Sequence, residues 1–240
     1  MRALFRTIFF EPLYNLLIWL SSIVPGHDLG VAIILLTLLV KFALLPLQHR
    51  ALTTQKKLKE LEAEIAALKA KHQSDSAAQA QAIMALYRAH GVNPFSGFVT
   101  LLIQLPILFA LFYVFRDSLT INSQWLYAFI APPLGVNAHF LGLLDLTARS
   151  IPLALVAGVS QYFQISLAVP PLPKSSNQDQ PSLKADLARS MNMQMRFIFP
   201  VMITFVALGF PAAVVLYWVT SNCFAIVHEL WVRRRAKILS

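Results

Sequence analysis

Lys41 is the residue with the clearest chemical potential, because it is the only charged residue between Leu29 and Leu47. A charge inside an apolar span costs roughly 2.5 to 3.5 kcal/mol on insertion scales, and such residues usually face a cavity or a partner. Lys41 also lies six residues before Leu47, so its stem could carry the ammonium to the membrane interface. This stretch alone leaves both readings open.

The sequence shows no arrangement typical of an enzyme. No nucleophile, base and orienting acid converge, and no metal-ligand or phosphate-loop spacing occurs. The six histidines are scattered, and the single cysteine, Cys223, falls in an apolar run that predicts a buried side chain. We therefore predict that the protein is not an enzyme and uses no cofactor and no metal.

The composition indicates an integral membrane protein. Of the 240 residues, 57% are hydrophobic and only 13% are charged, against roughly 25% charged in soluble proteins, and the mean hydropathy is +0.62. The net charge of +9 could suggest nucleic acid, but basic excess in a membrane protein more often reflects cytoplasmic loops. We expect no sequence-specific binding of nucleic acid.

Residues 1–28 form the first segment. Leucines at helical spacing lie beside polar residues, and this mixed face favours a helix lying in the membrane interface. A spanning anchor and a cleaved signal peptide are the alternatives, although no convincing small-residue cleavage site precedes Pro25.

Residues 49–91 form a polar block with two apolar stripes at spacings of three and four, which predict an antiparallel helical hairpin. Ser76 and Gln79 fit a capping box that opens the second arm, and Gly91 fits a helix stop. Asn93 and Pro94 fit the start of the next helix.

The rest of the core, residues 29–240, reads as an all-α bundle of five transmembrane helices. The predicted spans are 29–47, 95–115, 151–169, 197–209 and 211–229, with a loop at 170–196 and a basic tail at 230–240. A break at Pro211 puts 15 Lys and Arg residues on one side of the membrane and four on the other. The positive-inside rule therefore predicts an outside amino terminus and a cytoplasmic carboxyl terminus.

Four stretches together resemble the YidC insertases of the Oxa superfamily. They are LLPL at 44–47, ALYRAHGVNPFSGFVTLLIQLPILFALFY at 85–113, FLGLLDL at 140–146 and FPAAVVLYWVTSN at 210–222. Apolar helices look alike, so the joint order and spacing carry the resemblance. The likeness is to a short, core-only form without a large external domain.

This resemblance implies a membrane insertase and chaperone with a hydrophilic groove open to the cytoplasm and to lipid. Lys41 stands where the family usually has arginine, and it would attract the acidic ends of substrates. The other groove positions implied by the family are Thr37, Gln104, Gln164, Tyr217, Trp218 and Asn222. From the residues alone, the glutamines could instead join neighbouring helices, and the Tyr-Trp pair could anchor at an interface.

The implied location is the bacterial plasma membrane, and the implied partners are nascent membrane proteins and membrane lipids. The SecY translocon and the ribosome are further partners that the family suggests. Two rival functions stay open: a small transporter coupled to ions or protons, and an assembly chaperone that acts only beside a translocon. Against the transporter stand the lack of acidic partners in the spans and of an inverted repeat.

Overall fold

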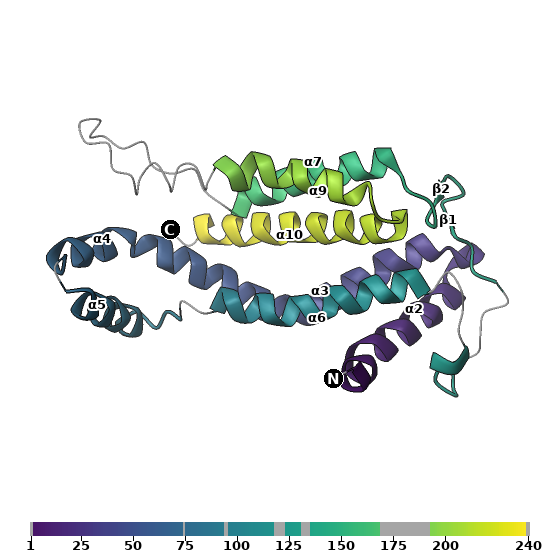
Figure 1. The fold of residues 1–240 in the computed structure, drawn as a ribbon, viewed down its shortest axis with the longest axis horizontal. Helices are drawn as coiled ribbons and strands as arrows, with labels where there is room; N and C mark the ends of the chain where they lie inside the picture. The colour runs from purple at the N-terminus through teal and green to yellow at the C-terminus, as the bar shows by residue number, and fades with distance from the viewer. Residues whose placement is uncertain are drawn as a thin grey trace. The chain divides into compact units, whose positions relative to one another are not determined.

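The computed structural model describes residues 2–73, 75–93, 96–117, 123–130, 135–168 and 193–238. The predicted all-α class is confirmed: within these residues the only sheet is a short two-stranded one. The chain divides into two compact units, which we describe separately. The first comprises Met1–Lys41 and Phe109–Ser240, and the second comprises Phe42–Leu108 (Figure 1).

The first unit begins with a helical run made of α1 (Arg2–Phe5), the π-helical turn η1 (Arg6–Phe10) and α2 (Glu11–Ile23). On α2 one face is fully buried, with Tyr14 and Leu17 at 0% exposure. The run ends at Val24, which is extended, and the turn η2 (Pro25–His27) follows. Its placement in the membrane interface stays a prediction.

A buried amide fixes the η3 turn (Ser123–Trp125) to this run. Asn15 is 2% exposed, and its Nδ2 donates a 2.8 Å hydrogen bond to the carbonyl oxygen of Trp125. In return its Oδ1 accepts a 2.7 Å bond from the Tyr127 backbone N–H. The Trp125 ring stands edge-on to Phe10 at 5.1 Å. Both polar ends of the amide are thus satisfied, as burial requires.

α3 is a single helix from Leu29 to Glu60, although Pro46 lies inside it. Asp28 caps its start, because Oδ1 accepts bonds from the backbone N–H groups of Gly30 (2.8 Å) and Val31 (3.1 Å). The helix therefore continues well beyond residue 47, where we expected the first span to end. The first arm of the predicted hairpin begins as its extension, because proline is tolerated in membrane helices that re-satisfy the freed carbonyl.

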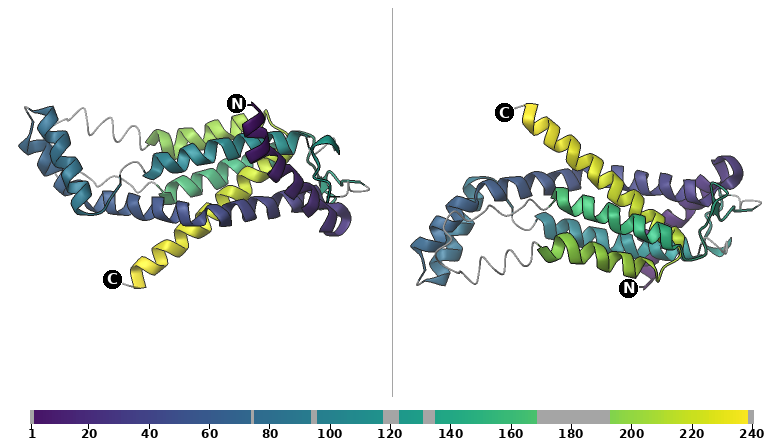
Figure 2. Two further views of the ribbon diagram at one scale, coloured as in Figure 1. Left: turned by 90° about the horizontal axis from the view of Figure 1, so that it is seen from below. Right: turned by 90° about the horizontal axis from the view of Figure 1, so that it is seen from above.

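The core of the first unit is formed by α7 (Ile151–Ala168), α9 (Phe199–Ala207) and α10 (Ala212–Ile238). α7 packs against both α9 and α10, and the three lie together in both views (Figures 1 and 2). The fully buried residues at their contact are small, namely Ala154, Ala157, Ala207 and Val215. Small residues let helices approach closely in membranes.

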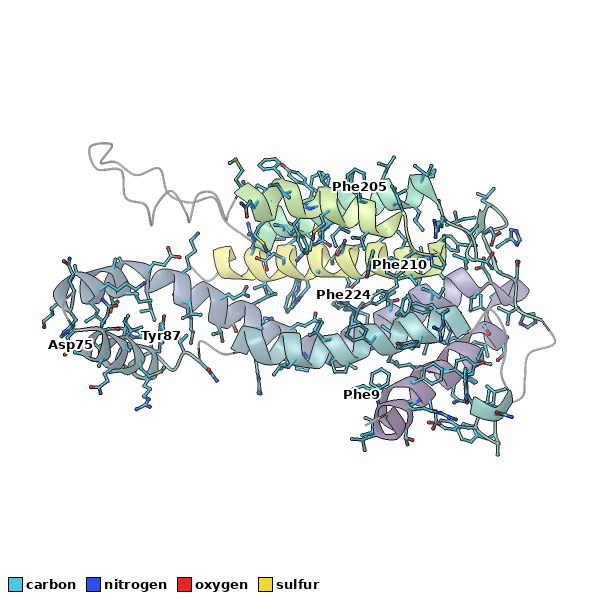
Figure 3. All side chains as sticks on the ribbon, in the orientation of Figure 1. Phe9, Asp75, Tyr87, Phe205, Phe210 and Phe224 are labelled. Carbon is cyan, nitrogen blue, oxygen red and sulfur yellow. The ribbon has the colours of Figure 1, made fainter. Side chains whose placement is uncertain are left out.

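The chain turns between α9 and α10. Phe210 lies in this turn (Figure 3), where its ring contacts Phe112 at 5.5 Å and Trp218 at 5.6 Å. Phe112 belongs to α6 (Ser96–Asp117), whose last residues lie in the first unit. The π-helical turn η4 (Gln194–Ile198) directly precedes α9, and the two together form a short helical segment, Gln194–Ala207.

Within the described residues three helices are long and apolar enough to cross a membrane, namely Leu29–Glu60, Ile151–Ala168 and Ala212–Arg234. Two shorter apolar helices, Leu105–Arg116 and Gln194–Ala207, overlap parts of the remaining predicted spans, 95–115 and 197–209. One apolar stripe of α7 suits contact with lipid, since residues four apart along it are more than half exposed: Ile151, Leu155, Val159 and Phe163. The last helix runs to Ile238, so most of the predicted tail at 230–240 is helical.

The second unit contains the hairpin of α4 (Glu62–Lys71) and α5 (Ser76–Ala89), which run antiparallel (Figure 1). The predicted capping box was wrong. Asp75, labelled in Figure 3, is the cap, because its Oδ1 accepts 2.9 Å bonds from the N–H groups of Ala77 and Ala78. A carboxylate one residue earlier serves the helix N-terminus better than the Ser76 hydroxyl, since it carries negative charge.

Gln79 instead bonds across the hairpin, where its Nε2 donates to the Lys69 carbonyl at 3.1 Å. α5 ends as expected beside Gly91, whose φ of +61° suits a residue after the helix cap. α6 begins at Ser96, and the predicted role of Pro94 lies outside the described residues.

A small hairpin of β1 (His139–Phe140) and β2 (Leu144–Asp145) precedes α7. His139 pairs with Asp145 and Phe140 with Leu144 in antiparallel register. Two backbone bonds tie the following residues to the start of α10, since Ala212 N–H donates to the Ala148 carbonyl at 2.9 Å and Ala213 N–H to that of Leu146 at 3.1 Å.

Candidate functional site

Lys41 lies on the flank of α3 rather than on its lipid-facing stripe. The exposed stripe consists of Leu35, Leu39 and Phe42, which are 37%, 47% and 60% exposed. At about 100° per residue, Lys41 lies about 100° or more around the helix from each of these three. Lys41 itself is half-buried. Lys41 therefore lies away from the exposed apolar stripe of α3.

Lys41 makes no hydrogen bond and no ion pair with any residue that the structure describes. Most charged side chains inside membrane proteins pair with another charge or with backbone carbonyls. A half-buried ammonium without such a partner is therefore available for an anionic group supplied from elsewhere.

Thr37 lies one helical turn before Lys41 on the same side of α3 and is fully buried. Its Oγ1 donates a 2.6 Å hydrogen bond to the Ile33 carbonyl, so the hydroxyl proton is used within its own helix. Thr37 can still accept a hydrogen bond, but it cannot donate a second one.

The two neighbouring aromatic residues on α10, Tyr217 and Trp218, contact different helices. Tyr217 is 3% exposed, and its ring lies 5.8 Å from that of Phe115 on α6. Trp218 is partly buried and packs against the small-residue core of α7 and α9. Both rings thus take part in packing within this unit, in addition to any contact with substrate.

Polar residues join α7 to α10 one turn further along. Asn222 Nδ2 donates a 3.0 Å bond to Ser160 Oγ, and Ser160 Oγ donates to the Ala157 carbonyl at 2.8 Å. Gln164 lies one turn after Ser160, and its Oε1 accepts a 2.9 Å bond from Gln161 Nε2. Asn222 therefore acts between helices, whereas Gln164 is paired within its own helix.

The predicted site residues are thus partly brought together. Lys41, Thr37, Gln164, Tyr217, Trp218 and Asn222 all belong to the first unit. Gln104 belongs to the second, in α6, and its side chain is outside the described residues. Cys223 was predicted to be buried and is exposed, because it lies on the outward face of α10, next in sequence to the inward-facing Asn222.

One polar cluster was missed from the sequence. Glu229 is 6% exposed and accepts a 2.9 Å ion-pair bond from Arg233 Nε. The Arg233 guanidinium also donates to the Leu167 carbonyl at the end of α7. The Glu-x-x-x-Arg spacing on a helix is the signal in the sequence that could have found this pair, whereas the predicted basic tail at 230–240 includes Arg233.

These features define a class: a polytopic helical membrane protein with polar groups inside its helical bundle and, on an apolar helix, a lysine that pairs with none of the described residues. Among the described residues no group of three or more His, Cys, Asp or Glu is suited to a metal ion. Such a site can attract and hydrogen-bond a ligand, but its side chains offer no nucleophile activated by a base.

Comparison with known proteins defines the family. Residues 19–238 match the model of the 60Kd inner membrane protein family, so the chain belongs to that family. The resemblance drawn from the sequence is confirmed. The chain is 35% identical over 206 residues to the membrane protein insertase YidC of Clostridium tetani, which covers 85% of this chain and 82% of that protein.

Two further relatives carry the same name. The Clostridium perfringens protein is 31% identical over 237 residues, which is 96% of this chain and 91% of that protein. The Syntrophobacter fumaroxidans protein is 29% identical over 237 residues, which is 96% of this chain but 38% of that protein. The chain thus spans about two fifths of its longer relatives and most of the length of its shorter ones.

Proposed function

We propose that the protein is a membrane-protein insertase that moves nascent apolar segments into the bilayer without catalysis. The observation that carries this proposal is the family match over 19–238, together with relatives named as insertases. Lys41 supports it from the structure, because it is half-buried, lies off the lipid-facing stripe and has no partner among the described residues.

In this mechanism a hydrophilic groove open to the cytoplasm accepts the short polar end of a substrate. Lys41 attracts carboxylates on that end, with Thr37 one helical turn away as a neighbouring polar group. An ion pair at about 4 Å is worth about 1 kcal/mol in bulk water and about 4 kcal/mol at an effective dielectric constant of 20. A wet groove falls between these limits. We therefore expect the ion pair to contribute about 1.4 kcal/mol, which corresponds to a roughly tenfold change in insertion.

Lysine in place of the family's usual arginine alters this contact. A lysine ammonium is a compact charge on a flexible stem, whereas a guanidinium binds a carboxylate with two parallel bonds. We therefore propose attraction without strict geometry, so that acidic ends of different shape are accepted.

Hydrophobic partition then drives the apolar segment into lipid along α7 and α10. Burial of apolar surface yields ~25 cal/mol per Å², which is ample for a helix of about 20 residues. The segment Gln194–Ala207 is about 21 Å long, well below the hydrocarbon thickness of ~30 Å. A short helix of this kind favours local thinning of the bilayer, which lowers the barrier for a polar end.

The proposed setting is the bacterial plasma membrane, with the amino terminus outside and the carboxyl terminus in the cytoplasm. The α4–α5 hairpin would then lie in the cytoplasm and receive nascent membrane proteins, with the SecY translocon and the ribosome as further proposed partners. The excess of Lys and Arg in 49–91 and in 230–240 supports this orientation.

The test is insertion of a single-span substrate into proteoliposomes that contain only the purified protein. The substrate has an acidic external end, and a matched version carries amides instead. Lys41→Ala should lower insertion of the acidic substrate about tenfold, from the ion-pair energy above, and leave the amide version unchanged. Lys41→Arg should insert both normally.

The alternatives give different results in the same assay. Equal insertion of both substrates by Lys41→Ala would remove the charge from the mechanism. Insertion that requires added SecY translocon would indicate an assembly chaperone. Ion flux through proteoliposomes without substrate would favour the transporter.

A further inference from the structure

The turn of the β1–β2 hairpin exposes two leucines, Leu141 and Leu143. Leu141 is 64% exposed and Leu143 is 90% exposed. We call Leu141, Gly142 and Leu143 the hairpin tip; no charged residue lies between Phe140 and Leu144. An isolated exposed leucine needs no explanation, but two at the end of a projecting turn form a small apolar point.

The backbone of the tip is unusual for its residues. Leu141 has a φ of +52° and Gly142 a φ of +71°. Positive φ suits glycine or asparagine, and a bulky side chain there is uncommon. Turn formation alone would therefore favour a small residue at 141. An outlier of this kind points to a use for the side chain itself.

The tip is fixed to the start of α3. The backbone N–H of Leu141 donates a 2.7 Å bond to Asp28 Oδ2, while Oδ1 of the same carboxylate caps α3. Behind the tip, Gly30 and Phe140 are in such close contact that a Cβ on Gly30 would lie 2.6 Å from Phe140 Cβ. The backbone of the tip is thus held against the start of α3, while both leucine side chains are exposed.

The same loop meets the beginnings of two more helices. It leads directly into α7 at Ile151, and its Leu146 and Ala148 carbonyls accept bonds from the start of α10. Three membrane-spanning helices therefore begin at this loop, and the boundary between water and lipid must fall close to it. The lipid-facing stripe of α7 starts here as well, with Ile151 at 66% exposure.

We propose that the hairpin tip inserts its two leucines into the lipid surface, at the boundary of headgroups and acyl chains in the leaflet where α3 begins. The tip would then set the height of the bundle in the bilayer. Two leucines are too small an area for a stable protein interface, which normally buries more than about 1,000 Å². They suffice for a lipid contact that continues an existing lipid-facing stripe.

The test measures depth with single spin labels on the full chain in lipid nanodiscs, where both membrane faces are accessible. Cys223→Ser removes the exposed natural thiol, and Leu143→Cys places the label. Leu155→Cys on the α7 stripe is the lipid reference, and Ser76→Cys at the start of α5 is the water reference; both side chains are exposed. Collision rates with oxygen and with a water-soluble nickel chelate give the depth.

We expect the label at 143 to collide several-fold less often with nickel than the label at 76, and to approach the oxygen rate at 155. Nickel collision equal to that at 76 would overturn the proposal. Protection that appears only when a protein partner is added would overturn it too, because the occupant would not be lipid. The readout is depth rather than insertion, so either result leaves the proposed insertase function standing.

Discussion

Gly158 should control how closely α7 approaches α9. A Cβ built on Gly158 would overlap Thr204 Oγ1 and would lie 3.3 Å from the Pro200 carbonyl oxygen. Thr204 Oγ1 is itself bound to that carbonyl at 3.0 Å. Gly158→Ala therefore forces Thr204 to rotate and give up its hydrogen bond, or forces the helices apart.

The expected change in the free energy of unfolding combines two costs with one gain. Overpacking of this kind costs about 1–3 kcal/mol, and the lost hydrogen bond about 1 kcal/mol. The higher helix propensity of alanine offsets about 1 kcal/mol. Gly158→Ala should thus destabilise the protein by about 1–3 kcal/mol, which is the range left by these terms.

Variants of Thr204 isolate its contact with residue 158. In Thr204→Ala the overlapping oxygen is gone, so adding Gly158→Ala should be neutral or stabilise by about 1 kcal/mol. Thr204→Val keeps the branched shape and is the matched control, because its methyl group preserves the clash. Unfolding in mixed micelles, followed by tryptophan fluorescence, to which Trp218 in this core contributes, measures all five variants beside the wild type. Equal destabilisation by Gly158→Ala in the Thr204→Ala and Thr204→Val backgrounds would refute the packing argument.

Three further changes test other contacts. Asp28→Asn keeps one oxygen to cap α3 but cannot accept two sets of N–H groups, so we expect faster amide hydrogen exchange in the β1–β2 hairpin with little loss of α3. Asp75→Ala should destabilise the α4–α5 hairpin by about 1 kcal/mol, whereas Ser76→Ala should not, as judged by thermal circular dichroism. Glu229→Gln weakens the bond to Arg233, whose side chain is 41% exposed; we expect a loss of about 1–2 kcal/mol in micelle unfolding, with unchanged insertion.

Local sequence patterns predicted helices well where the residues of a single helix determine its course. The stripes in 49–91 and the glycine at 91 indicated a hairpin, and α4 and α5 form it. Pro46 shows the limit of such patterns, because α3 passes through it without a break and continues to Glu60. Whether proline ends a membrane helix depends on what else satisfies the freed carbonyl, and the neighbouring residues in sequence do not contain that information.

Long-range polar contacts were beyond a reading of the sequence. Asn15 bonds the backbone of Trp125, 110 residues away, and Asp28 bonds Leu141, 113 residues away. Asn15 lies within α2 and Asp28 directly before α3, where solvent exposure and helix capping are the usual expectations. Only the fold brings a second partner to each side chain. The same reason explains why Trp218 could be named as a site residue but not assigned to the contact with α7 and α9.

The two ionisable residues best placed to distinguish structure from function are Glu229 and Lys41. Glu229 is buried near the end of α10 and is bound by Arg233, which also reaches α7, so its charge is used by the protein itself. Lys41 is less buried, yet none of the described residues compensates its charge. A protein that needed Lys41 only for stability would gain by replacing it with leucine, because an unpaired charge in a span is costly. The cost is tolerable if water reaches the ammonium and if the charge is reserved for a visiting carboxylate, and both conditions are what the mechanism we propose requires.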